Sequence, residues 1–80
     1  MQELQSLYVV EKWNGDEIIF EIKEKDGDDS VIYEVFSQGK YLFTLSPEGK
    51  LIYDNVDKKE ERLIYYRPVL IRDIKRSLHI

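Results

Sequence analysis

Apolar and polar residues alternate along the first two-thirds of the chain, in short runs separated by glycine-containing turns. Such runs predict β-strands, here near residues 6–13, 17–24, 31–36, 40–45 and 50–54. One glycine falls in each intervening turn, at Gly15, Gly27, Gly39 and Gly49. Strands joined by turns this short pair antiparallel, so the pattern predicts a five-stranded β-meander.

The turn at Asn14-Gly15 is the strongest local signal in the sequence. Asn-Gly favours a two-residue type I′ turn, because both central positions of that turn need a positive φ angle. This turn sets Trp13 opposite Asp16 and fixes the register of the whole hairpin. The register gathers apolar side chains on one face of the sheet, namely Leu7, Val9, Ile18, Phe20 and Ile22.

The next two turns extend this apolar face. A two-residue turn at Asp26-Gly27 would set Ile22 opposite Val31. In "FSQGK" we expect Gly39 to be a bulge residue, which sets Val35 opposite Tyr41 and keeps the large side chains together. The alternative is a plain Gln38-Gly39 turn, which would move Tyr41 to the opposite face.

The fourth turn, "SPEGK" at residues 46–50, has the serine, proline and glycine positions of a type I turn followed by a bulge. It predicts Leu45 opposite Leu51 and Phe43 opposite Tyr53. The aromatic residues expected on the core face are therefore Tyr33, Tyr41 and Tyr53.

The last third of the chain changes to a helical period. Leu70, Ile74 and Leu78 recur at helical spacing, and Pro68 suits a first helical position, so we expect an amphipathic helix at 68–78. Residues 57–66 stay open between two structures. Asp57 and Glu60 have the spacing of a capping box that would start a short helix, whereas Leu63–Tyr66 could form a sixth strand.

These elements predict an α+β fold of one domain, residues 1–80, with the helix packed on one face of the antiparallel sheet. A helix of eleven residues covers roughly 160 Å², whereas five strands present about 400 Å². Further cover of the apolar sheet surface is therefore needed. It can come from a second helix at 57–66, from curling of the sheet or from another subunit, and we favour a homodimer.

Composition and charge narrow the classes of function. The chain is 42% hydrophobic and 35% charged, as in globular proteins. Its net charge is −4, but residues 1–30 carry −6 and residues 67–80 carry +3. Only the C-terminal segment is therefore suited to contact nucleic acid. We expect a soluble cytoplasmic protein, since the sequence shows no signal-peptide pattern and no membrane-length apolar run.

Candidate chemistry is sparse. The absence of cysteine excludes disulfides and thiolate metal sites. The acidic stretch from Asp26 resembles the start of a calcium loop, but Val31 and Ser37 stand where that loop needs glycine and glutamate. We therefore interpret it as a turn and predict no metal site and no cofactor.

The sequence gives equally little evidence for catalytic groups. His79, the single histidine, lies near the end of the chain and is a poor general base. No carboxylate stands at an obviously buried position. Glu21 and Glu34 are expected as diagonal neighbours on the second face of the sheet, where solvated strand residues are typical. We expect that the protein is not an enzyme.

The aromatic and basic residues that we expect to be exposed are the feature of the sequence that points most clearly to a function. Tyrosine offers a large contact area with a polar tip, and clustered cations attract acidic partners. The candidate interaction surface comprises Tyr8, Tyr65, Tyr66, Arg67, Arg72, Lys75 and Arg76. We expect a small non-catalytic interaction module, homodimeric or bound to another protein. The alternative is a nucleic-acid- or ribosome-associated accessory protein that uses the basic C-terminal helix.

Overall fold

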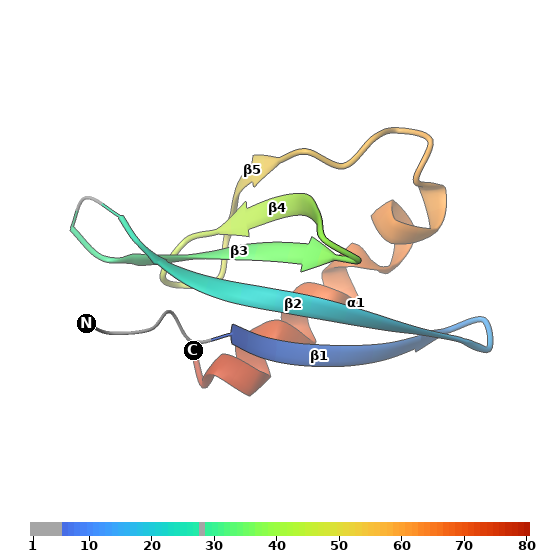
Figure 1. The fold of residues 1–80 in the computed structure, drawn as a ribbon, viewed down its shortest axis with the longest axis horizontal. Helices are drawn as coiled ribbons and strands as arrows, with labels where there is room; N and C mark the ends of the chain where they lie inside the picture. The colour runs from blue at the N-terminus through green and yellow to red at the C-terminus, as the bar shows by residue number, and fades with distance from the viewer. Residues whose placement is uncertain (1–5, 28) are drawn as a thin grey trace.

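The computed structural model describes residues 6–27 and 29–80 and confirms the α+β fold (Figure 1). One antiparallel sheet has the strand order β1-β2-β3-β4-β5, the meander that the turns predicted. The elements are β1 (Ser6–Trp13), β2 (Asp16–Asp26), β3 (Val31–Ser37), β4 (Lys40–Leu45), β5 (Leu51–Asp54) and α1 (Glu61–Leu78).

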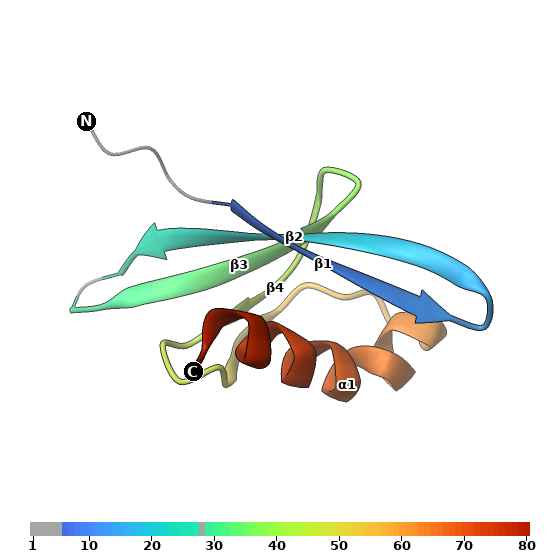
Figure 2. The ribbon, with the colours of Figure 1, turned by 90° about the horizontal axis from the view of Figure 1, so that it is seen from below.

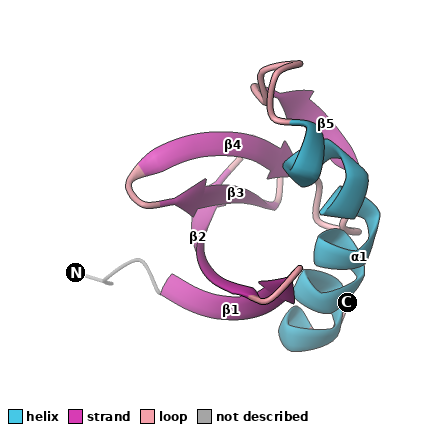
Figure 3. Cartoon of the chain, turned by 90° about the vertical axis from the view of Figure 1, so that its right-hand side faces the viewer, coloured by secondary structure: helices cyan, strands magenta, loops and turns pink. Residues whose placement is uncertain are grey.

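The sheet curls, and α1 lies against its concave side. Figure 2 shows the helix running beneath the strands, and Figure 3 shows it across the open side of the curl, between β1 and β5. The core fills the space between sheet and helix. It comprises Val9, Trp13, Phe20, Ile22, Tyr33, Val35, Leu42, Phe43, Leu45, Leu63, Leu70 and Ile74.

The β1–β2 hairpin has the predicted register. Trp13 pairs with Asp16, and the pairing continues in step to Ser6 opposite Lys23. Asn14 and Gly15 both have positive φ angles, 55° and 86°, as a type I′ turn requires. The turn chemistry was therefore sufficient to place every side chain of this hairpin on its face.

The predicted register of β2 with β3 is wrong by four residues. Ile22 pairs with Val35 rather than Val31, because β2 continues to Asp26, which itself pairs with Val31. The loop is longer than two residues and is closed by the Gly27 N–H, which donates to the Ser30 carbonyl at 2.7 Å. Since the shift is even, the same side chains still face the core.

The β3–β4 turn is the two-residue Gln38-Gly39 turn, so the bulge predicted at Gly39 is wrong. Gln38 and Gly39 both have positive φ angles, and Tyr41 pairs with Phe36 on the face away from the helix. An irregularity follows within β4, where Leu42 has no partner in the ladder. It returns Phe43 to the core and also buries Leu42.

The β4–β5 turn forms as predicted, but the register slips beyond it. The Ser46 N–H donates to the Lys50 carbonyl at 2.7 Å, and Leu45 pairs with Leu51. After an irregularity, Tyr53 pairs with Thr44 instead of Phe43. Tyr53 is 70% exposed, so its predicted place in the core is wrong.

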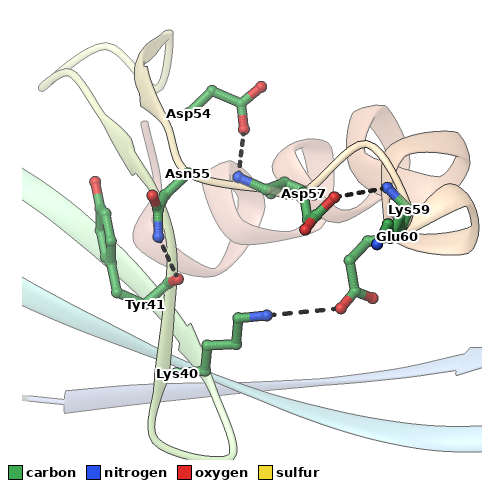
Figure 4. A network of polar contacts seen from close by, with 8 residues as sticks. Lys40, Tyr41, Asp54, Asn55, Asp57, Lys59 and Glu60 are labelled. Atoms are coloured by element: carbon green, nitrogen blue, oxygen red, sulfur yellow. Dashed lines mark hydrogen bonds and ion pairs between the residues drawn. The ribbon is translucent and has the colours of Figure 1, made fainter.

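Polar contacts close the segment between β5 and α1 (Figure 4). The Asn55 side chain donates to the Tyr41 carbonyl at 3.4 Å, and the Lys40 ammonium lies 3.7 Å from the Glu60 carboxylate. Asp57 accepts a hydrogen bond from the Lys59 N–H at 2.9 Å. Residues 57–60 form a turn, so the capping-box alternative is wrong, and Glu60 caps α1 without a side-chain hydrogen bond.

The helix is longer than predicted and contains Pro68 instead of beginning there. It begins at Glu61, so Leu63–Tyr66 are helical and not a sixth strand. Proline in a helix removes one hydrogen bond, and here burial of Leu63 and the packing of Tyr66 against the core offset that loss. The longer helix and the curled sheet together supply cover that an eleven-residue helix could not.

Candidate functional site

The seven residues of the predicted interaction surface do not form one surface. Tyr8 lies on the outer face of the sheet, the face opposite α1, and is 62% exposed. The other six residues belong to α1, which packs on the concave side (Figure 3). The structure therefore divides them into two separate candidate sites.

The two neighbouring helix tyrosines have different environments. Tyr65 is 77% exposed, whereas Tyr66 is half-buried and stacks on Trp13 with ring centroids 4.9 Å apart and planes 10° from parallel. Trp13 in turn contacts Phe20 at 5.2 Å. Tyr66 therefore extends an aromatic cluster that joins the helix to the β1–β2 hairpin.

Arg67 fastens the middle of the helix to β5. Its guanidinium donates to the Asp54 carboxylate at 2.7 Å, and only 20% of its side chain is exposed. The Val56 N–H donates to the same carboxylate at 3.0 Å. This backbone hydrogen bond, together with Arg67, holds the pKa of Asp54 below its ordinary value of 3.8. Arg67 is thereby engaged within the fold.

The remaining cations, Arg72, Lys75 and Arg76, line one shallow hollow on the surface of α1. We call it the basic hollow. Its lining comprises Pro68, Ile71, Arg72, Lys75, Arg76 and Ile80. Arg72 also reaches the Asp73 carboxylate at 3.4 Å, and its side chain is 61% exposed. His79, next to the hollow in sequence, is exposed.

The outer face of the sheet exposes a group of large apolar side chains. Val10 and Ile19 are directly paired between β1 and β2, and Tyr8 is the diagonal neighbour of Ile19. The exposed fractions of Tyr8, Val10 and Ile19 are 62%, 53% and 52%. We call these three residues the outer patch.

Charges of both signs surround the outer patch in equal number. By register, the outer face of β1, β2 and β3 carries Lys12, Lys23, Lys25, Glu17, Glu21 and Glu34. The Tyr8 hydroxyl donates to Glu21 at 3.4 Å, and the Lys25 ammonium lies 3.9 Å from Glu34. Glu21 and Glu34 are diagonal neighbours, as expected, and each has its own partner.

Glu11 is a buried acid that the sequence analysis missed. It lies between Val9 and Trp13 on the core face of β1, is 8% exposed and accepts a hydrogen bond from the Trp13 indole N–H at 3.4 Å. Burial, together with Asp73 on α1, raises the pKa of Glu11 above its ordinary value of 4.5. Strict alternation with Val9 and Trp13 was the signal that could have placed it there.

The Glu11 carboxyl therefore lies between the sheet and the helix, where Asp73 and Arg72 of α1 face it. Among residues 6–27 and 29–80, no group of three side chains has the arrangement needed to bind a metal ion. Nor does α1, the helix in this part of the chain, have the apolar length to span a membrane.

Comparisons with protein-family models, with curated proteins and with solved structures give no match for this chain.

Proposed function

We propose that the domain is a small non-catalytic interaction module that forms a homodimer through the outer patch. The observation that carries this proposal is the exposure of Tyr8, Val10 and Ile19, each more than half exposed, in one contiguous group. Isolated exposed apolar residues are normal, whereas contiguous ones are typical of interfaces. Tyrosine adds a large contact area and a polar tip.

Charge favours a second copy of this chain as the partner. The three lysines and three glutamates of the outer face cancel, although the chain as a whole carries −4. Two such faces meet without net repulsion, and lysines of one copy can approach glutamates of the other. A strongly charged partner would gain no attraction here. Two-fold homodimers are also the commonest oligomers.

The expected dimer is weak. A standard interface buries about 800 Å² on each partner, whereas a five-stranded sheet face presents only about 400 Å² in projection. The buried apolar surface is therefore small, and we expect dissociation in the micromolar range.

The nucleic-acid alternative has less support from the geometry. Of the four basic residues that it used, Arg67 is paired with Asp54 within the fold, which leaves three cations on a short segment of the helix. Proteins that bind single-stranded nucleic acid usually combine a longer basic groove with stacking aromatics.

The test is light scattering over a dilution series with the Val10→Thr/Ile19→Thr variant. Wild-type mass should rise from 9.6 kDa toward twice that value as concentration increases. The variant should stay monomeric, because threonine keeps the strand preference but removes apolar contact area.

A matched control removes two apolar side chains from the helix instead. Ile64→Thr/Val69→Thr changes residues that are 38% and 39% exposed on α1 and should leave the dimer intact. A wild-type protein that is monomeric at all concentrations would contradict the proposal. Equal loss of the dimer in both double variants would show that the outer patch is not the interface.

A further inference from the structure

The basic hollow lies outside the proposed dimer surface. Its lining residues, from Pro68 to Ile80, recur mostly at steps of three and four, so they follow one stripe of the helix surface. Half of them are apolar and half are cationic. No acidic side chain lines the hollow in the part of the chain that the structure describes.

The end of the helix builds one wall of the hollow. His79 has a left-handed φ angle of 61°, and its N–H donates to the Arg76 carbonyl at 3.2 Å. The Ile80 N–H donates to the Lys75 carbonyl at 3.0 Å. These two bonds form a Schellman motif, which turns the chain back and places Ile80 beside the last helical turn. Backbone hydrogen bonds thus fix this wall.

Packing against the β4–β5 turn positions Lys75. The stem of its side chain lies over Gly49, so closely that a Cβ atom at Gly49 would be 2.6 Å from Lys75 Cγ. Arg72 has only a long contact of 3.4 Å with Asp73. No ion pair involves Lys75 or Arg76 among the described residues. Lys75 is thus held in position, and acidic groups neutralise the three cations of the basic hollow only weakly.

We infer that the basic hollow docks an acidic peptide segment that carries an apolar side chain. Carboxylates of such a segment would pair with Arg72, Lys75 and Arg76, while its apolar side chain would contact the apolar lining. Charge complementarity supports this partner, because the hollow is cationic within a chain of net charge −4. The outer sheet face is neutral by comparison, and the chain without the three cations of the hollow is net acidic, so an acidic segment gains attraction mainly at this site.

An acidic peptide fits the lining better than RNA does. RNA binding by stacking needs exposed aromatic rings in the groove, and the hollow is lined by proline and isoleucine instead. Docking here is independent of the homodimer, because α1 and the outer patch lie on opposite sides of the sheet. Binding and self-association can therefore be measured separately.

Fluorescence anisotropy with a short fluorescein-labelled peptide of glutamate and leucine tests the inference on the whole chain. The comparison probes are the same peptide with serine in place of leucine, and a labelled oligouridylate. The leucine peptide should bind more tightly than both. Equal binding of the serine peptide would overturn the apolar part of the inference, and tighter binding of the oligouridylate would overturn the choice of partner.

Two double variants with the same change in net charge separate a site from general electrostatics. Arg72→Glu/Arg76→Glu alters the hollow, whereas Lys58→Glu/Lys59→Glu alters exposed residues that precede the helix. The first should weaken binding of the leucine peptide about tenfold and the second much less, because contact charges matter more than distant ones. Thermal unfolding checks that both variants fold.

Equal weakening in the two double variants would overturn the inference, since net charge alone would then explain binding. A loss of dimer mass in Arg72→Glu/Arg76→Glu would also overturn it, because the hollow would then be filled by a second copy. A different result would contradict the proposed homodimer, namely a wild-type protein that is monomeric and still binds the peptide.

Discussion

Gly49 has a positive φ angle that suits glycine alone and also a close neighbour, whereas Gly15 has the same angle with no neighbour. Both glycines have a φ angle of 86°, but only Gly49 has a side chain, that of Lys75, where a Cβ would lie. Gly15→Ala should lower the free energy of unfolding by about 1 kcal/mol from the positive φ alone. Gly49→Ala should lower it by at least about 1 kcal/mol more, because the Lys75 stem must move.

Urea denaturation of the two glycine variants measures this difference. Equal losses would mean that the Lys75 stem moves at no cost, and that the β4–β5 turn does not position it.

His79 adopts a backbone conformation that glycine would adopt more easily. It has a φ angle of 61° at the end of α1, where left-handed glycine is the usual residue. His79→Gly should therefore raise the free energy of unfolding by about 0.5 kcal/mol. Ser77→Gly, within the last helical turn, should lower it, because glycine is a poor residue in a helix. Thermal unfolding distinguishes the two variants. A loss of stability in both would contradict the capping role of His79.

Strand positions were predictable from the sequence because turn chemistry acts locally. Asn14-Gly15 needs only its own φ angles to fix a hairpin, and the first register was correct. The predicted register of β3 with β4 was wrong, because the two possible turns at Gly39 differ little in their local sequence preference. Packing decides between them, since the bulge at Leu42 buries both Leu42 and Phe43. The early start of α1 depends in the same way on contacts with β1 that no local pattern contains.

The candidate site was predicted only in part. Residue type pointed correctly to exposed Tyr8 and Tyr65, and it pointed to Arg72, Lys75 and Arg76, which share the basic hollow. The β1–β2 register, which was predicted correctly, already places Tyr8 on the face opposite Val9. Residue type could not show that Arg67 is paired with Asp54, because that pair depends on where α1 lies against β5 in the assembled fold.

Two carboxyl groups near opposite edges of the sheet face α1, and their effects on stability have opposite pH dependence. Near β5, the pKa of Asp54 is lowered, so its contribution to stability is present above 3.8 and is lost as pH falls through its folded pKa. At β1, the pKa of Glu11 is raised, so its contribution is complete below 4.5 and is lost as pH rises through its folded pKa.

Glu11→Gln tests whether the buried acid destabilises the helix–sheet contact at neutral pH. The groups that face Glu11 are the Trp13 indole on its own strand and Asp73 and Arg72 on α1. Glutamine can still accept from the indole and can donate to Asp73, and it removes the charge. At about pH 8 the variant should therefore melt a few degrees above the wild-type protein, whereas at about pH 4 the two should melt together.

The control for Glu11→Gln is Glu17→Gln, which changes the net charge equally at an exposed position of the same hairpin. It should not reproduce the gain at high pH, because Glu17 is hydrated and its charge carries little desolvation cost. If Glu11→Gln lowers the melting temperature at about pH 8, the Glu11 carboxylate stabilises the contact in its charged form. An equal shift at both pH values would instead indicate a packing effect, since protonation of Glu11 would then make no difference to how α1 is held on β1.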